Sequence, residues 1–193
     1  MNERTILNAT REILRQGEVL LGVLDDAAYC AKVPAAFNSS VGGHYRHCLD
    51  HFQSVFDGLG AAEVNYDQRK RDARVETIRG VALDQTKDLL RRSEEIDNWT
   101  LGCPIRVRSK VSYAIDEPPS AISTVGREMM FCIVHAIHHY ALIRVVCGML
   151  SVFLPEGFGV APSTIKYRQP AVIDGDRFGS SLNKEPALDQ QAA

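Results

Sequence analysis

The sequence predicts an all-α protein, an antiparallel four-helix bundle with a short extended or hairpin segment between its third and fourth helices. Two observations carry this prediction. Four long stretches space their apolar residues as amphipathic helices do, and one stretch between the last two alternates apolar and polar residues. The 193 residues are enough for one domain with a proper core. We expect the bundle over residues 1–168 and a polar C-terminal tail over residues 169–193.

The first two helices are expected over residues 5–29 and residues 40–59. Both show apolar side chains at helical spacing. One stripe of the second helix is polar where it begins and apolar where it ends, and consists of Ser40, His44, His47, His51, Val55 and Leu59. Because buried imidazoles need hydrogen-bond partners, a stripe so rich in histidine is unusual for a face that packs on a core.

The third and fourth helices are expected over residues 68–98 and residues 124–153. Between them, residues 105–116 place apolar side chains at nearly every odd position, which is the period of extended structure. We interpret this segment as a crossover connection with some strand content, in the form of a short hairpin that turns near Ser109.

Composition and charge exclude several classes of partner. An apolar fraction of 45% and a charged fraction of 24% are those of an ordinary soluble protein. The net charge of −2 provides no basic field for nucleic acid. We also expect no membrane partner, because the longest apolar run, residues 129–154, is interrupted by histidines, Arg144 and Gly148. No signal-peptide pattern follows the first residues, and the cysteines are odd in number without a CxxC motif, so we expect a cytoplasmic protein with reduced thiols.

All six histidines fall into two short clusters. His135 and His139 are four residues apart, so they share one helix face at the spacing by which a helix offers two imidazoles to one metal ion. A third nitrogen must come from elsewhere, and the cluster of His44, His47 and His51 is the candidate source. The alternative is that the clusters are partly buried histidines held by hydrogen bonds. The residues alone leave both interpretations open.

Glu128 is the candidate catalytic carboxylate. It lies seven residues before His135, two turns away on the same helix face, where it could act as a general base or accept a hydrogen bond from a ligand ring. The alternative is a carboxylate that stabilises the positive end of the helix dipole. Cys48 and Cys132 each neighbour a histidine cluster. We interpret Cys132 as a core cysteine, with a fourth ligand or a thiol site as the alternative, and the residues leave the role of Cys48 open.

The two clusters together resemble the DinB/YfiT-like superfamily of metal-dependent helical bundles. The resemblance rests on Gly-x-His-x-x-His at residues 42–47 followed by His-x-x-x-His at residues 135–139. Five further stretches are similar to one bacterial subgroup and occur in the same order: residues 40–52, 65–69, 123–128, 138–143 and 158–164. Together they cover about residues 5–168.

The resemblance implies a divalent metal ion held by three histidines, which by position are His47, His135 and His139. Zinc or nickel suits nitrogen ligands best, and iron or manganese is also compatible. His44 matches a common upstream histidine of the family that is not usually a ligand, while His51 and His138 have no clear counterpart. Some relatives are thiol-dependent transferases. Many of these have Arg-Gly-Gln after the last ligand, where this chain has Tyr140-Ala141-Leu142.

Three imidazoles would leave open positions on the ion, and a bound water would have its pKa lowered toward about 7. We therefore expect a metal-dependent enzyme, a hydrolase or thiol-linked transferase, acting on a small-molecule substrate. The alternative is a non-catalytic metal- or ligand-binding bundle of a stress response, and a homodimer is compatible with either. His44 and His51 are the candidate residues around the bound ion: they either close its coordination as a further ligand or line the pocket as proton carriers.

Overall fold

The computed structural model describes residues 3–114 and 116–168 of the chain. It divides into two compact units, residues 1–161 and residues 162–193. The second unit is described only in its short helix α8 (Pro162–Arg168), a helix that the sequence pattern did not predict. The expected tail over residues 169–193 lies outside the described residues. All that follows on the fold concerns the first unit.

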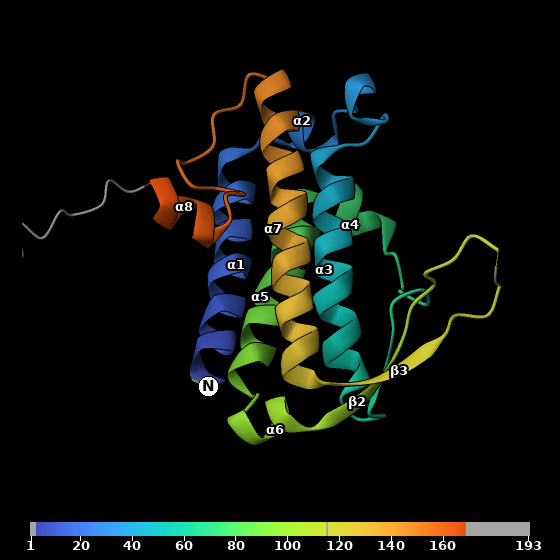
Figure 1. Ribbon diagram of the computed structural model, residues 1–193. Helices are drawn as coiled ribbons and strands as arrows, with labels where there is room; N and C mark the ends of the chain where they lie inside the picture. The colour runs from blue at the N-terminus through green and yellow to red at the C-terminus, as the bar shows by residue number, and fades with distance from the viewer. Residues whose placement is uncertain (1–2, 115, 169–193) are drawn as a thin grey trace, which may run out of the picture. The chain divides into compact units, whose positions relative to one another are not determined.

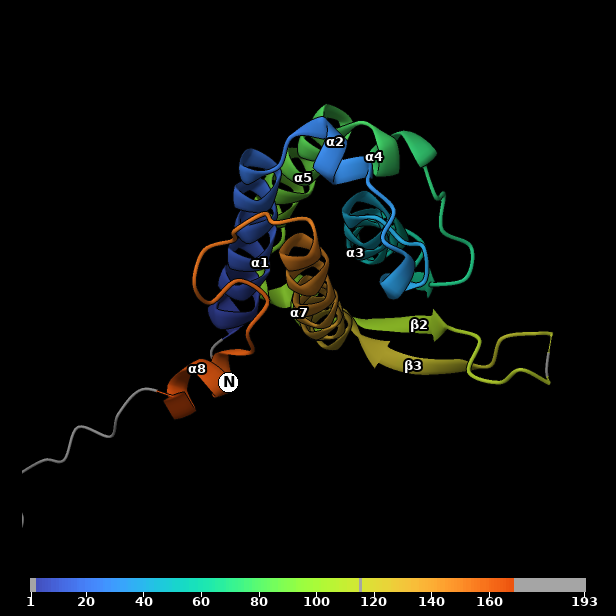
Figure 2. The same ribbon diagram turned by 90° about the horizontal axis from the view of Figure 1, so that it is seen from above.

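The first unit is mostly helical and carries a small sheet. Its long helices are α1 (Glu3–Val23), α3 (Val41–Gly58), α5 (Arg79–Glu94) and α7 (Val125–Met149). Helix α3 contacts α5 and α7, and α1 also contacts both, so the four lie side by side (Figures 1 and 2). Shorter helices connect them, namely α2 (Asp26–Cys30), the 3-10 turn Pro34–Ala36, α4 (Ala73–Thr77) and α6 (Asn98–Gly102).

Helix α7 is the longest helix, and its buried side chains are spread from Val125 to Cys147. Its buried residues include Met129, Ala136, Tyr140 and Ile143, which pack among buried side chains of the other long helices. By length and composition alone α7 is long and apolar enough to cross a membrane, despite the histidines, Arg144 and Gly148 that interrupt it. The core helix of a soluble protein meets the same criterion, and α7 packs here against α1 and α3.

The sheet has three strands in the order β1 (Glu63–Asn65), β2 (Pro104–Arg108) and β3 (Ser120–Thr124). Strands β1 and β2 are parallel, and β2 and β3 are antiparallel. Strand β1 follows α3, and β3 leads directly into α7, so the sheet lies at the end of the helices where α3 ends and α7 begins (Figure 1).

Two of the expected helices are interrupted. The helix expected over residues 5–29 ends at Val23, and Asp25 then caps α2 by accepting a hydrogen bond from the backbone N–H of Ala28 at 2.7 Å. The helix expected over residues 68–98 begins only after Asp72 and is broken at Ile78, whose backbone is extended. In both places local backbone and capping geometry prevails over an apolar spacing that runs through the break.

The sequence predicted a hairpin that turns near Ser109, and the predicted position of the turn is wrong. Strand β2 ends at Arg108, and its antiparallel partner begins at Ser120, beyond Pro118-Pro119. The period-two pattern therefore continues past the real strand. The pairing of β2 with β1 was not predicted, because β1 is short and lies about forty residues earlier in the chain.

Candidate metal centre

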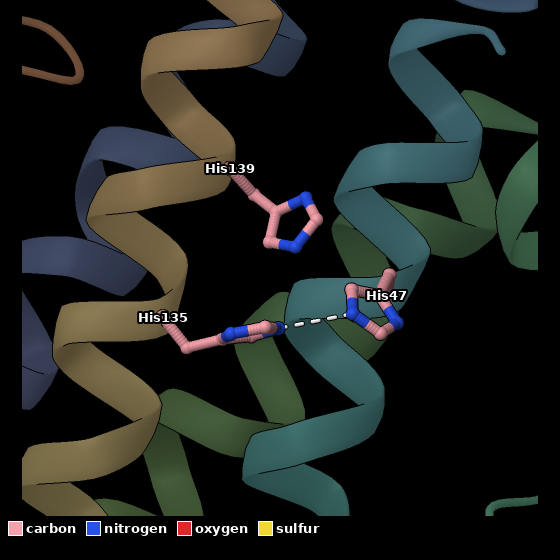
Figure 3. Close-up of side chains that lie close together, drawn as sticks. All are labelled: His47, His135 and His139. Carbon is pink, nitrogen blue, oxygen red and sulfur yellow. Dashed lines mark hydrogen bonds between the residues drawn. The ribbon is translucent and has the colours of Figure 1, made fainter. Parts of the chain in front are cut away.

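Three half-buried histidines meet between α3 and α7, two helices that contact each other. His47 lies on α3, and His135 and His139 lie one turn apart on α7. Their candidate ligand nitrogens all lie within 4.8 Å of one another, and the Nε2 atoms of His47 and His135 are 2.9 Å apart. Figure 3 shows the two rings of α7 pointing toward the ring of α3. Two nitrogens that bind one ion at right angles, each about 2.1 Å from it, lie about 3 Å apart, so the arrangement fits a shared ion.

A chain of hydrogen bonds fixes which nitrogen of His139 is free. The hydroxyl of Ser39 donates to the carbonyl oxygen of Ala36, so its oxygen accepts from Nε2–H of His44 at 2.9 Å. The other ring nitrogen of His44, Nδ1, then accepts from Nδ1–H of His139 at 3.1 Å. Because a neutral imidazole carries one proton, Nε2 of His139 keeps its lone pair for a metal ion.

His51 is held in a similar way on the opposite side of His47. It is buried, and its Nδ1–H donates to the backbone carbonyl of His47 at 2.8 Å. Its Nε2 accepts from the guanidinium of Arg69 at 3.0 Å. Within the described residues, His44 and His51 thus have both ring nitrogens in hydrogen bonds. Neither offers a free lone pair to a fourth coordination position in this arrangement.

Burial keeps the central imidazoles neutral. Burial, together with the charge that the neighbouring His51 and His139 would carry, lowers the pKa of His47 to about 2. Burial likewise lowers the pKa of His135 and His139 to about 4. A neutral imidazole is the form that binds a metal ion, so burial favours the ligand form of these rings at neutral pH.

Glu128 is buried beside the sheet rather than in contact with the histidines. It accepts hydrogen bonds from the hydroxyls of Tyr66 at 2.7 Å and Ser123 at 2.6 Å, and from Arg127 at 2.9 Å. The ring of Tyr66 in turn stacks on His51, with ring centroids 5.3 Å apart. The described contacts link Glu128 to the three-histidine group indirectly, through Tyr66 to His51 and through Tyr66 and Phe131 to His135. Its role as a general base stays a prediction.

The remaining candidates lie outside the group. His138 is exposed on α7 and touches His139 edge-on, with ring centroids 5.4 Å apart. Cys48 and Cys132 are buried, and burial raises the pKa of both thiols well above the usual range, which suits unreactive core cysteines.

Sequence reasoning placed none of Ser39, Tyr66 and Arg69 at the metal centre: Ser39 was a candidate helix cap, and Arg69 belonged to a charge run expected to be solvated. All three touch histidines of this centre, yet all three lie outside the helices that carry the histidines. Periodicity says nothing about loop side chains. The one available signal was that Tyr66 and Arg69 belong to residues 65–69, a stretch that carries part of the family resemblance.

Comparison with known proteins adds one family and one relative. A sequence model of the DinB superfamily matches residues 9–143, more than half of the chain and all three central histidines. Over 104 residues the chain is 33% identical to a protein of Rhizopus delemar named FK506-binding protein 5. That stretch is 54% of this chain and 27% of the relative, so the chain spans only about a quarter of the relative's length. No solved structure matches the chain.

Proposed function

The chain belongs to the DinB superfamily, and from this membership and the three-histidine group we propose that it binds one divalent metal ion through His47, His135 and His139. The observation that carries the proposal is the convergence of three neutral imidazoles from two facing helices. We also infer that α1, α3, α5 and α7 form the antiparallel four-helix bundle expected of the family. Zinc or nickel suits the three nitrogens best, and iron or manganese is also compatible.

The arrangement around the three histidines supports an enzyme rather than a purely structural metal site. A structural zinc site is closed by four protein ligands, whereas a catalytic one keeps a position for water or substrate. Here His44 and His51, the nearest further imidazoles, are occupied by Ser39, His139, Arg69 and the His47 carbonyl. When bound, the ion would supply Lewis-acid activation of a water or a substrate.

The residues around the ligands then have distinct tasks. His44 orients His139, and Arg69 together with the His47 carbonyl holds His51 in one tautomer. We propose that the reaction is hydrolysis or a thiol-linked transfer on a small molecule. Both reactions need the open coordination position that three histidines leave.

Metal analysis of the untagged protein tests the binding proposal. We expect about one divalent ion per chain, and loss of that ion in His135→Ala and in His139→Ala. His138→Ala is the matched control, because His138 is exposed and points away by about 100° of helix rotation from its neighbour His139. Unchanged metal content in both ligand variants would show that the assignment is wrong.

Cobalt substitution tests the enzyme proposal separately. Cobalt at an open site changes its visible absorption spectrum when an anion such as azide binds, whereas a closed site does not respond. We expect a response in the wild-type protein. A spectrum that responds to azide only in His44→Ala or His51→Ala would mean that one of these residues closes the site, and a non-catalytic metal-binding role would replace the enzyme proposal.

A further inference from the structure

The three-histidine centre contains no carboxylate in the part of the chain that the structure describes. The group of side chains that could hold one ion consists of His47, His135 and His139, and no Asp or Glu joins it. The two neighbouring imidazoles, His44 and His51, make no hydrogen bond to an acid among the described residues. A divalent ion held by neutral imidazoles alone would keep both of its positive charges.

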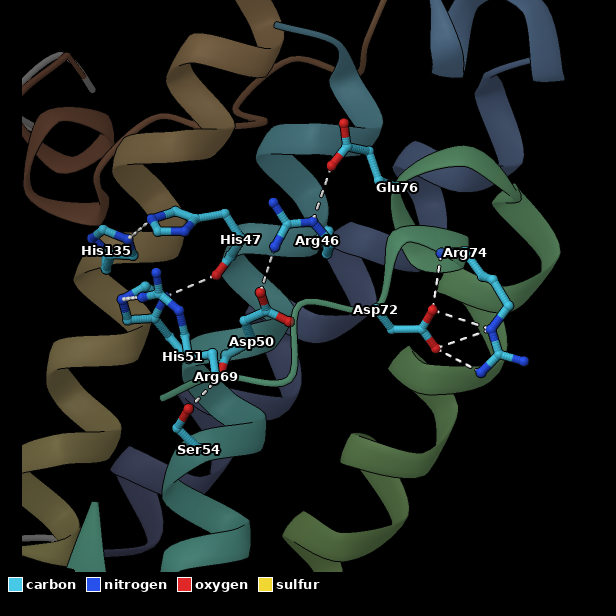
Figure 4. A network of polar contacts seen from close by, with 10 residues as sticks. All are labelled: Arg46, His47, Asp50, His51, Ser54, Arg69, Asp72, Arg74, Glu76 and His135. Carbon is cyan, nitrogen blue, oxygen red and sulfur yellow. Dashed lines mark hydrogen bonds and ion pairs between the residues drawn. The ribbon is translucent and has the colours of Figure 1, made fainter. Parts of the chain in front are cut away.

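Arg69 adds a further positive charge beside this centre. Its terminal nitrogen Nη1 lies 3.0 Å from Nε2 of His51, as Figure 4 shows. The ring of His51 in turn lies against two of the proposed ligands, with its centroid 4.6 Å from that of His47 and 4.2 Å from that of His135. One imidazole therefore separates the guanidinium from two of the three ligand rings.

The charge of Arg69 is not balanced by an ion pair within the described residues. The nearby carboxylates of Asp50 and Glu76 both pair with Arg46 instead, at 2.6 Å and 3.1 Å (Figure 4). Burial lowers the pKa of Arg69, and Asp50 opposes this shift from beyond ion-pair distance. The guanidinium stays protonated even so. A partly buried cation without a partner is costly, so a negative group close to it would be favourable.

The electric field of Arg69 reaches the ligand rings. Burial is the main cause of the low pKa of His47 and His135, and the positive charge of Arg69 is among the charges that lower both further. A neutral ligand on the ion would gain little from this field. A negatively charged ligand would be attracted by the ion and by the guanidinium together.

We propose that the open coordination position takes an anionic group of a small molecule, a carboxylate or a phosphate, and that the charge of Arg69 sets this preference. The inference rests on the proposed function, because it needs an ion at the three histidines with one position left open. Carboxylate and phosphate are the anions that a guanidinium recognises best in proteins, and both offer the ion an oxygen ligand.

The cobalt-substituted protein tests the preference with one neutral and two anionic ligands. Imidazole, acetate and phosphate are each titrated while the visible spectrum is recorded. We expect imidazole and at least one of the two anions to change the spectrum of the wild-type protein. A protein that takes up no cobalt, or that responds to none of the three ligands, would overturn the open metal site and this inference with it. A response to imidazole alone would overturn only the preference for an anion.

Substitution of Arg69 separates its charge from a structural role. Arg69→Met should weaken binding of the anion about tenfold and leave the affinity for imidazole within about twofold. Arg69→Lys keeps the charge and should bind the anion more tightly than Arg69→Met does. Arg71→Met is the matched control, because it removes the same charge from an exposed position of the same segment. An equal loss for imidazole would show that Arg69 only keeps His51 away from the ion, and would overturn the proposal, as would wild-type affinity for the anion in Arg69→Met.

The affinity for the metal ion itself provides a second measurement. Removal of a positive charge close to a dication should let Arg69→Met bind the ion at least as tightly as the wild-type protein does. Competition with a chromophoric chelator measures this affinity in Arg69→Met and in the control Arg71→Met. The loss of a residue that merely supported the ligand rings would have the opposite effect. Weaker metal binding in a folded Arg69→Met than in Arg71→Met would therefore overturn the proposal.

Discussion

At the scale of single residues, His44 shows how a histidine can serve a metal centre without being a ligand. The Ala36 carbonyl can only accept, so the Ser39 hydroxyl donates to it and accepts from Nε2–H of His44. Nδ1 of His44 is then an acceptor for Nδ1–H of His139. The proton on Nδ1 of His139 and the free lone pair on its Nε2 are consequences of that chain. Ligand histidines in metalloproteins commonly donate their second N–H to such a partner, which fixes the ring and its tautomer.

We therefore predict that His44→Ala weakens metal binding without abolishing it. The expected loss is about 10- to 100-fold in affinity, because His139 keeps its nitrogen but loses the partner that orients it. Competition with a chromophoric chelator measures this affinity. His138→Ala is again the control. Complete loss of the ion in His44→Ala would instead indicate a direct ligand, and no change would show that the hydrogen bond to His139 does not matter.

At the scale of elements, the centre depends on how closely α3 approaches its neighbours. Helix α3 begins at Ser40, whose hydroxyl caps the backbone N–H of Gly43 at 3.0 Å. A Cβ atom added at Gly42 would lie 2.0 Å from the carbonyl oxygen of Glu76 and 2.8 Å from the ring of Tyr29. The glycine is thus required by the backbone of α4, which passes over the first turn of α3, one turn before His47.

Gly42→Ala should destabilise the fold by about 1–3 kcal/mol, because the added methyl group must displace backbone rather than a flexible side chain. Gly148→Ala is the matched control, since a Cβ added there meets nothing within 4 Å. Alanine at that position, near the end of α7, should be neutral or stabilise the protein by up to about 1 kcal/mol. Urea denaturation measures both. Equal stability of the two variants would contradict the close approach at α3.

At the scale of the whole molecule, the buried histidines couple folding to pH. Burial lowers the pKa of His51, His135 and His139 to about 4, and that of His47 to about 2. A histidine in the unfolded chain has a pKa of about 6.5. Between these values the unfolded chain binds more protons than the folded one. Lowering the pH through this window therefore favours unfolding. Above about pH 6.5 these histidines are neutral in both states and no longer change the stability with pH.

The metal-free protein should accordingly lose stability steadily as the pH falls from about 6.5 to about 4. Urea denaturation at a series of pH values measures the slope. In His51→Gln, which keeps an amide donor and acceptor in place of the ring, the slope should correspond to about one proton less. A stability that is flat across this window would mean that the histidines are not held neutral by the fold.

Features that depend on local geometry could be predicted from the residues alone. Helical spacing marked the regions of the four long helices, and the four-residue separation of His135 and His139 placed both rings on one face of α7. The family resemblance, confirmed by the match over residues 9–143, pointed to His47 as their partner. The helices and the pairing of His135 with His139 needed only the pitch of an α-helix and the residue types along it, whereas His47 came from the resemblance.

Contacts between elements that are distant in the sequence became known only from the folded chain. His47 and His135 are 88 residues apart in the chain, and Arg69 reaches His51 from a segment that the apolar spacing had assigned to a helix. The breaks at Leu24 and Ile78 and the pairing of β1 with β2 likewise depend on backbone geometry and on contacts that no periodicity encodes. The physical reason is that spacing records which face of an element is buried, whereas the partner on that face is chosen by packing of the whole chain.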